Sequence, residues 1–403
     1  MPKRLIVLFL FLLGIGNVAA FAQPATPGAF DTKAAQAFMI EASTGTILLA
    51  KNEDQLISPA SLAKLMTLDV VFDAIGRGEI GPDTEYPVSE NAWRTGGAPS
   101  RASTMFAALK SRIRVGDLIQ GVAVQQANDA CIVLAEGMSI SESEFARRMT
   151  ARAREIGMTR SIFTNSTGLP DTSDPNAGSK VSVREMVMLA QDLQEKHPDL
   201  YKYFGQADFT WNRIYQRNKN PMLLLNIGVD GLGLGFAESE GFSIVASIQR
   251  DGRRLFLALG GLKSDKERIE ETRRVLEWGL SNFKSQRIFA EGDVIGDASV
   301  YGGAVSTVGL QAKIPVDVYV PVETPDRLSA RIVYRWPLTA PVAAGYEAGT
   351  LRVFLGARLV RELPLYTRES VAQGTLGRRA FDALIELTES LLFSWLWDKP
   401  LPS

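Results

Sequence analysis

The sequence is poor in residues that several common chemistries need. Its 403 residues include one cysteine, Cys131, and one histidine, His197. A single cysteine cannot form an internal disulfide, so the fold has to be stabilised by packing. The shortage also excludes a histidine-rich zinc site and argues against a cysteine nucleophile paired with histidine. His197 precedes Pro198 in a charged stretch, which predicts a solvated helix end.

The chain also lacks an excess of either charge. Lysine and arginine number 44 against 45 aspartate and glutamate, and the formal net charge is −1. This balance gives no electrostatic reason to expect nucleic acid as a main partner. A chain of this length can bury a substantial core and is expected to hold two domains.

The apolar run at the N-terminus is too short to span a bilayer. Basic residues at 3–4 precede the apolar residues 5–15, and the small residues Ala20 and Ala22 follow. This order predicts a secretory signal peptide over residues 1–22, cleaved after Ala22. A short N-terminal anchor is the alternative. No cysteine lies near the cleavage site, so the signal offers no lipoprotein attachment point.

Periodicity predicts an α+β domain over residues 29–284, with helices on both sides of a hairpin-connected sheet. A helix beginning at Ser182 has Glu185 in place for a capping box, and Asp251-Gly252 predicts a hairpin turn. The predicted strands cover residues 37–40, 46–50, 229–235, 242–249 and 255–260, and further predicted helices cover 115–137, 145–156 and 265–283.

The character changes after Lys284. Residues 285–372 carry alternating apolar and polar positions, which predict a small β-rich domain. Residues 373–403 contain an amphipathic helix with Trp395 near its end. That helix is a candidate membrane anchor lying in the bilayer surface. The alternative is a terminal helix packed on the β domain, because its local charge is not positive.

Residues 58–67, S-P-A-S-L-A-K-L-M-T, carry the strongest chemical signal. Pro59 suits the first turn of a helix, which places Ser61 among free backbone N–H groups at the positive end of the helix dipole. Lys64 is three residues on, so its amine shares a face with the Ser61 hydroxyl. This geometry permits a lysine-activated serine nucleophile. Ser281 and Lys284 have the same spacing but resemble a helix end, so the spacing alone is weak evidence.

The longer string at 58–67 resembles the active-site motif of the low-molecular-mass penicillin-binding proteins, the serine D-alanyl-D-alanine carboxypeptidases. Segments around Asn128, residues 165–169, 218–220, 229–232 and 334–349 resemble this family in the same order. The resemblance implies a penicillin-binding, β-lactamase-like domain that needs no cofactor or metal. It also implies peptidoglycan stem peptides ending in D-Ala-D-Ala as substrates, β-lactams as acylating ligands, and a periplasmic location, peripheral on the inner membrane.

Carried onto this sequence, the family's roles fall on positions that are only partly retained. Ser61 is the acylated serine and Lys64 the candidate base. The second motif retains Asn128, but Gln126 stands where the family has a serine. The third motif, lysine-threonine-glycine, falls on Gly233, Leu234 and Gly235, so both side chains that would hold the substrate carboxylate are missing.

Two features of the resemblance do not depend on those side chains. The family oxyanion hole uses backbone N–H groups, which here would come from Ser61 and Phe236. Arg268 matches a family arginine near the carboxylate end of the cleft and could partly replace the missing lysine charge. The alternative for Arg268 is a solvated helix arginine.

The losses predict weak turnover. One charge-assisted hydrogen bond contributes about 1.5 to 3 kcal/mol, or roughly one to two powers of ten in rate. A lost acid–base partner costs on the order of 10² to 10⁴. We therefore expect a poor carboxypeptidase, with a non-catalytic peptidoglycan-binding or regulatory protein as the alternative. A β-lactamase is disfavoured by the extra β domain and by the lack of an identifiable water-activating base.

Overall fold

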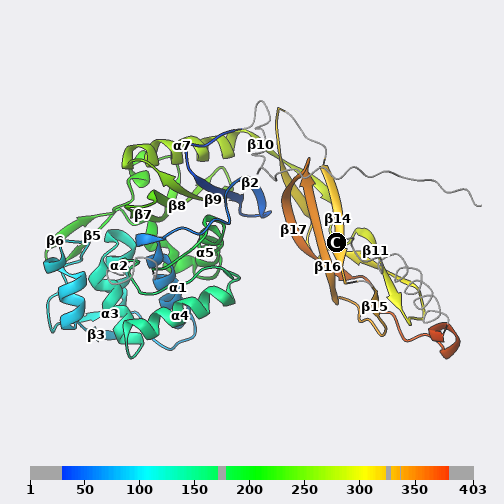
Figure 1. The fold of residues 1–403 in the computed structure, drawn as a ribbon, viewed down its shortest axis with the longest axis horizontal. Coiled ribbons are helices and arrows are strands. Elements are labelled where there is room, and N and C mark those ends of the chain that lie inside the picture. Colours follow the sequence, from blue (N-terminus) through cyan, green and yellow to red (C-terminus); the bar gives the residue numbers. More distant parts are fainter. Residues whose placement is uncertain (1–29, 171–177, 324–327, 336, 381–403) are drawn as a thin grey trace, which may run out of the picture. The chain divides into compact units, whose positions relative to one another are not determined.

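The computed structural model describes residues 30–170, 178–323, 328–335 and 337–380 (Figure 1). Helices and strands are mixed in the first part and strands dominate the second, which confirms the predicted α+β class. The predicted signal peptide, residues 1–22, and most of the predicted C-terminal helix lie outside the described residues. Among the helices in the described ranges, none has the length and apolar character needed to cross a bilayer.

The first domain is built on a five-stranded antiparallel sheet with the order β2-β1-β9-β8-β7. β7 is an edge strand, since β8 is its only partner in this sheet. The turn between β8 and β9 has positive φ at Asp251 (52°) and Gly252 (78°), as a two-residue hairpin requires. The strands are β1 (Gln36–Glu41), β2 (Thr46–Lys51), β7 (Val229–Ala237), β8 (Gly241–Arg250) and β9 (Arg253–Leu262).

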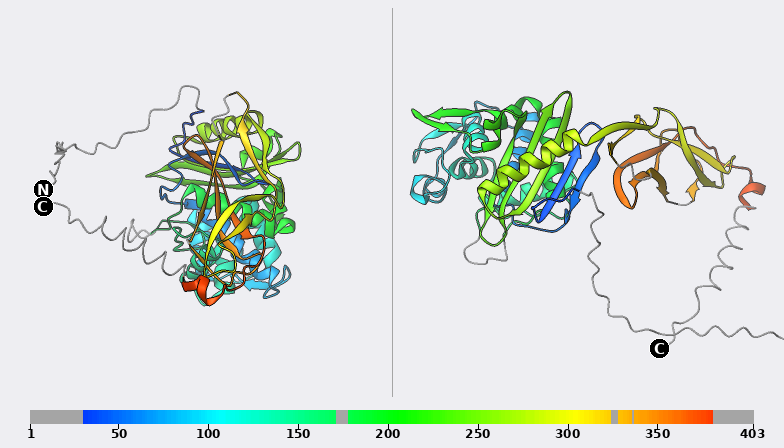
Figure 2. Two further views of the ribbon diagram at one scale, coloured as in Figure 1. Left: turned by 90° about the vertical axis from the view of Figure 1, so that its right-hand side faces the viewer. Right: turned by 90° about the horizontal axis from the view of Figure 1, so that it is seen from above.

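Helices cover both faces of this sheet, as predicted. α7 packs on β8 and β9, whereas α5 packs on β1 and β9 from the other side; Figure 2 shows α7 running across the sheet in the view from above. The short strand pairs β3 (Glu85–Pro87) with β4 (Arg112–Arg114) and β5 (Asp208–Trp211) with β6 (Ile214–Arg217) lie outside the sheet. The helices are α1 (Ala63–Gly76), α2 (Val115–Gln125), α3 (Asn128–Met138), α4 (Glu142–Glu155), α5 (Val183–Lys196), α6 (Pro198–Tyr201) and α7 (Asp265–Ser281).

The prediction of one continuous helix over residues 115–137 is wrong. Residues 115–137 form two helices, α2 and α3, because Gln126 adopts the left-handed conformation (φ 53°, ψ 41°) and ends α2. A residue other than glycine is uncommon in the left-handed conformation, and no pattern in the sequence predicted it at Gln126. The break starts α3 at Asn128, so it determines where the second motif lies.

Two local predictions are corrected in part. The Ser182 hydroxyl accepts the Glu185 N–H (3.2 Å), but the Glu185 carboxylate accepts from the Arg160 N–H and the Ser161 hydroxyl instead of completing the capping box. His197 ends α5 as expected, yet it is half-buried instead of fully solvated. Its ring packs edge-on against Phe72 with centroids 5.9 Å apart, and burial lowers its pKa.

The second domain has its own core. A six-stranded sheet has the order β14-β16-β17-β12-β11-β15, and a two-stranded sheet joins β10 to β13. Alternate residues such as Val316, Val318 and Val320 are buried, which explains the period of two in the sequence. Its strands are β10 (Phe283–Phe289), β11 (Val294–Tyr301), β12 (Thr307–Gln311), β13 (Val316–Pro321), β14 (Leu328–Tyr334), β15 (Leu338–Thr339), β16 (Glu347–Leu355) and β17 (Arg358–Thr367).

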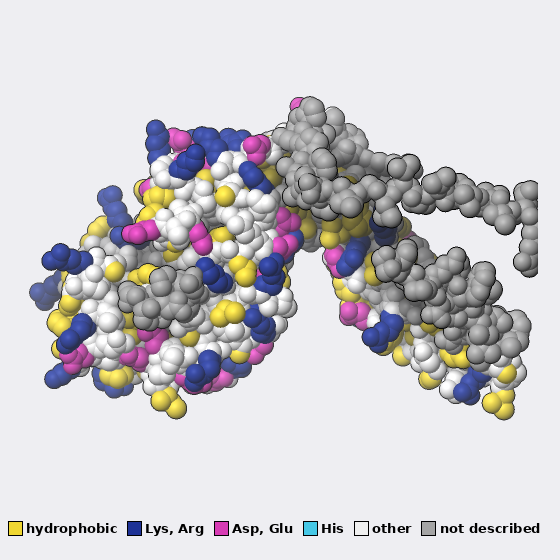
Figure 3. All heavy atoms as spheres, viewed as in Figure 1, with side chains coloured by type: hydrophobic (Ala, Val, Ile, Leu, Met, Phe, Trp, Pro, Cys, Tyr) yellow, Lys and Arg dark blue, Asp and Glu magenta, His cyan; other side chains and the backbone are white. Residues whose placement is uncertain are grey.

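Charged groups are well mixed on the face of the molecule drawn in Figure 3, where lysine and arginine side chains alternate with aspartate and glutamate. The near-zero net charge of the sequence therefore does not conceal a dominant one-sign field on that face.

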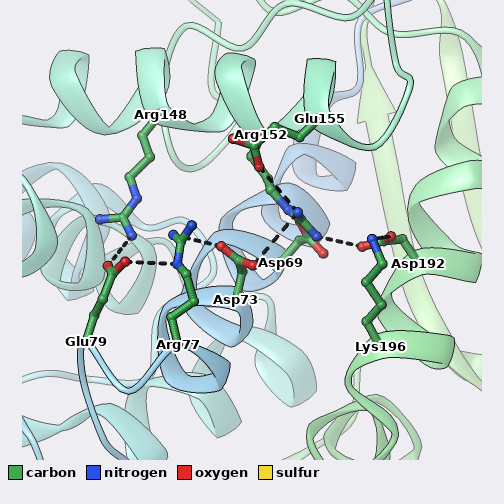
Figure 4. A network of polar contacts seen from close by, with 9 residues as sticks. All are labelled: Asp69, Asp73, Arg77, Glu79, Arg148, Arg152, Glu155, Asp192 and Lys196. Carbon is green, nitrogen blue, oxygen red and sulfur yellow. Dashed lines mark hydrogen bonds and ion pairs between the residues drawn. The ribbon is translucent and has the colours of Figure 1, made fainter.

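A buried ion-pair network joins α1, α4 and α5 (Figure 4). Arg152 donates from Nε to Asp69 (2.7 Å) and from Nη2 to Asp192 (2.7 Å). Asp69 is 0% exposed, and burial raises its pKa to about 6 although Arg152 opposes the shift. The guanidinium therefore compensates carboxylates that water does not reach, on the helix that continues from Ser61.

Replacing Arg152 with methionine should destabilise the fold at pH 7 by about 3 to 5 kcal/mol, because it leaves buried carboxylates uncompensated. The loss should shrink toward pH 5, since protonated Asp69 no longer needs a cation. Urea unfolding of the two proteins measures this difference.

Arg148→Met is the matched control. Arg148 lies one turn before Arg152 on α4 and pairs with the exposed Glu79. Its replacement should lower the free energy of unfolding by less than about 1 kcal/mol. Equal losses for the two variants would show that the Arg152 network is not a special source of stability.

Candidate active site

Ser61 lies in a short 3-10 turn, Ala60–Leu62, that runs directly into α1. The predicted helix start is therefore confirmed. Ala60 has a positive φ of 45°, a strained conformation for a residue with a Cβ. Ser61 is in the first turn, where backbone N–H groups have no intrahelical partner.

The Lys64 ammonium donates a hydrogen bond to Ser61 Oγ over 2.8 Å. Lys64 is 3% exposed, and burial lowers its pKa from 10.5 to about 8. A neutral amine is thus available at neutral pH in a minor fraction of molecules. This pair meets the geometric and electrostatic requirements for a serine activated by a lysine base.

Apolar surroundings account for the pKa of Lys64. A cavity of about 10 Å³, close to the size of one water, lies beside the pair. Cys131 of α3 is the other titratable group that interacts with Lys64. Burial raises the pKa of its thiol to about 12, so the thiol stays uncharged at neutral pH. Besides Ser61, Lys64 and Gln126, the cavity is lined by Leu65, Leu68, Val122, Ala123, Phe204 and Leu232.

The loop at residues 165–169 holds the strained turn in place. Gly168 has φ +74°, and a Cβ there would lie 1.8 Å from the Ala60 carbonyl oxygen. Asn165 Oδ1 accepts the Gly168 N–H (2.6 Å), and the Thr67 hydroxyl donates to the Ser166 carbonyl (2.7 Å). The sequence predicted a family resemblance for this segment but not its contact with the Ser61 turn, although the N-S-T-G pattern is typical of a tight turn.

Gln126 reaches across from the end of α2 to strand β7. Its Nε2 donates to the Leu234 carbonyl over 3.2 Å. Since β7 pairs with β8 on its other side, this carbonyl belongs to the open edge of the sheet. Gln126 therefore does more than replace a serine, because its amide occupies a backbone acceptor of the third motif.

Asn128 begins α3 and is buried. Its backbone N–H donates to the Ser103 carbonyl (2.8 Å), while its side-chain oxygen has no hydrogen-bond partner among the described residues. Within those residues no hydrogen bond joins Asn128 to Ser61 or Lys64. Its Oδ1 is thus an acceptor for which the described part of the chain supplies no donor.

Gln126 and the apolar side of α1 limit the space beside Gly233. A Cβ on Gly233 would lie 3.2 Å from Gln126 Nε2 and 3.4 Å from Leu65 Cδ2. Gln126 and Gly233 are therefore complementary in size. In the family motif the long side chain is the lysine on the strand, whereas here the long side chain is Gln126 at the end of α2. Gly235 is required for a different reason: a Cβ there would lie 2.8 Å from the Pro59 carbonyl oxygen, so β7 lies close against the Ser61 turn.

Phe236 lies near the end of β7, and Arg268 of α7 contacts the same strand through Gly235. Phe236 is 51% exposed and follows Leu234 by two positions, so its backbone N–H faces the same open edge. Arg268 is 6% exposed, so the alternative of a solvated helix arginine is wrong. Its Nη1 donates to the carbonyls of Gly235 (3.1 Å) and Ser243 (3.4 Å), and its Nη2 pairs with Asp265.

The structure thus brings Ser61, Lys64, Gln126 and the β7 edge together at one place. The repeated Ser-x-x-Lys pattern at Ser281 and Lys284 is a helix end, as expected, because Ser281 ends α7 and Lys284 lies in β10.

Two family models match the chain: D-alanyl-D-alanine carboxypeptidase over residues 20–262, and the C-terminal domain of penicillin-binding protein 5 over residues 283–373. The D-alanyl-D-alanine carboxypeptidase DacD of Escherichia coli is 31% identical over 388 residues, which cover 95% of this chain and 98% of the relative. DacC of the same organism is 30% identical over 390 residues, or 96% of each chain.

Solved structures agree with these matches. Penicillin-binding protein 5 of Haemophilus influenzae superposes with a TM-score of 0.71 at 30% identity, covering 86% of this chain and 99% of that one. Penicillin-binding protein 6B of Escherichia coli gives a TM-score of 0.64 at 28% identity, covering 85% and 97%.

Burial of Lys64 should lower the stability of the fold at neutral pH. Because its folded pKa of about 8 lies below the unfolded value, the unfolded chain binds more protons between these values and stability should rise with pH across them. Lys64→Met should therefore be more stable than the parent at pH 7 by up to roughly 3 kcal/mol.

This difference should fall toward zero as pH approaches 10.5, measured by denaturant unfolding at several pH values. Ser61→Ala is the control, because it leaves the buried amine in place. A Lys64→Met protein less stable than the parent at every pH would contradict the assignment.

Restoring a lysine at position 233 should depend on position 126. Gly233→Lys alone should destabilise the fold, because the new side chain enters space that Gln126 and Leu65 occupy. With Gln126→Ser in the same protein the cost should be smaller, giving a coupling of about 0.5 to 3 kcal/mol in a double-mutant cycle. Additive effects on unfolding would show that the two sites do not share this space.

Proposed function

Because the chain belongs to the D-alanyl-D-alanine carboxypeptidase family, we propose that Ser61 attacks D-Ala-D-Ala stem peptides of peptidoglycan and forms an acyl-enzyme with weak turnover. The observation that carries this proposal is the 2.8 Å hydrogen bond between Lys64 and Ser61, formed by a buried lysine whose pKa is lowered to about 8.

The reaction needs one proton path and one anion site. Neutral Lys64 takes the proton of Ser61 Oγ as the oxygen bonds to the substrate carbonyl carbon. The backbone N–H groups of Ser61 and Phe236 would stabilise the resulting oxyanion. Lys64 then returns the proton to the leaving amine, and a water molecule releases the acyl group. Asn128 Oδ1 supplies an acceptor for an incoming amide N–H.

The same geometry explains why turnover should be weak. Gln126 has no hydroxyl for proton relay, and its amide holds the Leu234 carbonyl that an extended peptide would use on the open edge. Gly233 and Leu234 offer no side-chain hydrogen bond to a carboxylate. Arg268, proposed earlier as a substitute cation, supports the strand through Gly235.

A second candidate is a non-catalytic protein that binds peptidoglycan or regulates wall enzymes. The hydrogen bond from Gln126 to the Leu234 carbonyl favours this candidate, because it stabilises the cleft but supplies no catalytic group. Binding that survives Ser61→Ala with unchanged affinity and cellular effect would support it.

For either function, the proposed location is the periplasm, with peripheral attachment to the inner membrane through residues 373–403.

A fluorescent penicillin should label the mature protein on Ser61, and Ser61→Ala should remove the label. The labelling rate should rise about tenfold per pH unit below pH 8 and level off above it, since the neutral form of Lys64 is the base. Lys64→Met should slow labelling by on the order of 10² to 10⁴.

Intact-mass analysis after each pH step measures the labelled fraction, with thermal unfolding as a check that each variant is folded. Label retained on Ser61→Ala would remove Ser61 acylation from the proposed function, and so would the absence of any label on the parent protein after prolonged incubation at high penicillin concentration at pH 8.

A further inference from the structure

We infer that this site prefers acyl donors whose leaving group has no carboxylate, such as a peptide that continues past the scissile bond or ends in a carboxamide, and that Gln126 determines this preference. The inference rests on the proposed acylation of Ser61 and adds the class of substrate.

Charge distinguishes the two classes of leaving group. A carboxypeptidase substrate carries a carboxylate on the residue just beyond the bond that breaks, so the negative charge must lie within a few bonds of the attacked carbonyl. Moving a carboxylate out of water is costly unless charged or strong hydrogen-bond donors receive it. The site should therefore present a free cation near Ser61 if free acids are its preferred substrates.

The cations placed closest to Ser61 by their contacts are already engaged. Lys64 Nζ is hydrogen-bonded to Ser61 Oγ at 2.8 Å. Arg268 donates to the Gly235 and Ser243 carbonyls and pairs with Asp265. Lys180 lies 3.8 Å from Glu240, whose other carboxylate oxygen accepts the Ser58 N–H at 2.5 Å. This last pair brings a negative charge as well as a positive one to the approach to Ser61.

The rest of the lining is neutral and suits an amide. Gly233 has no side chain, and Leu234 is apolar. Gln126 contributes a carboxamide, which both donates and accepts hydrogen bonds, whereas a lysine only donates. A carboxamide or an interior peptide bond carries the same pair of groups. Gln126 can therefore exchange its bond to the Leu234 carbonyl for two complementary bonds to such a leaving group.

Lys219 is the strongest objection to this inference. Its backbone N–H donates to the Val124 carbonyl (2.9 Å), two residues before Gln126, and its side chain is exposed. Among the described residues its ammonium makes no ion pair, so it could receive a carboxylate. Its role is decided by substitution.

The bonding changes are the same for both substrate types. The Ser61 Oγ–carbon bond forms, the carbon–nitrogen bond breaks, and the proton moves from Oγ through Lys64 to the leaving amine. Only the group beyond that amine differs, so a difference in rate reports recognition and not a change of chemistry.

The test compares diacetyl-L-lysyl-D-alanyl-D-alanine with its C-terminal carboxamide. Release of D-alanine or D-alaninamide gives kcat/KM, and intact mass gives the acylated fraction of Ser61. We expect the carboxamide to react about three- to tenfold faster than the acid. Gln126→Met keeps the side-chain length without its hydrogen bonds, and should reduce this preference, since the carboxamide then loses its two complementary bonds.

The variant carrying Gln126→Ser, Gly233→Lys and Leu234→Thr should reverse the preference to about ten- to hundredfold in favour of the acid, with thermal unfolding as the folding check. A parent protein that favours the acid tenfold would overturn the inference, and loss of that preference in Lys219→Ala would name the cation responsible. Acylation by neither substrate would overturn the proposed function and the inference with it.

Discussion

The hydrogen bond from Lys64 to Ser61 is the interaction on which the other features of the site depend. It joins two residues of one helical turn over 2.8 Å, and the surrounding apolar groups keep the amine away from water, which lowers its pKa to about 8. The strained Ala60 conformation and the close approach of Gly168 hold the serine in this turn. An amine buried without a carboxylate partner reduces stability, and its retention at this position is what a functional base would require.

The residues at the second and third motif positions, Gln126 and Gly233, are both changed from the family pattern and lie against each other. In place of a short residue facing a long lysine, a long glutamine faces a glycine, and its amide holds the strand through the Leu234 carbonyl. Gln126 therefore links α2 to β7 with a neutral amide where the family motif has a charged lysine. In the proposed site, Ser61 and Lys64 are in place although Gly233 and Leu234 offer no side-chain hydrogen bond to a carboxylate, and this is the physical basis for expecting a different leaving group.

Much of this arrangement could be predicted from the sequence because it depends on local rules. Pro59 and the Ser-x-x-Lys spacing predicted the helix that carries the nucleophile, and Asp251-Gly252 predicted the hairpin of the central sheet. What failed depends on contacts between distant segments. Gln126 adopts a left-handed conformation and bonds to a residue 108 positions away. The burial of Arg268 and the half-burial of His197 likewise follow from packing against Phe242 and Phe72, which no local pattern records.

The central claim is that Lys64 is an uncharged base for Ser61 in part of the population at neutral pH. The most direct measurement is the titration of the Lys64 side chain in the folded protein by NMR, with ¹³C- and ¹⁵N-labelled lysine and assignment by Lys64→Met. The account predicts a midpoint near 8. A midpoint near the ordinary lysine value of 10.5 would contradict it, because the amine would then be a permanent cation and could not accept the serine proton.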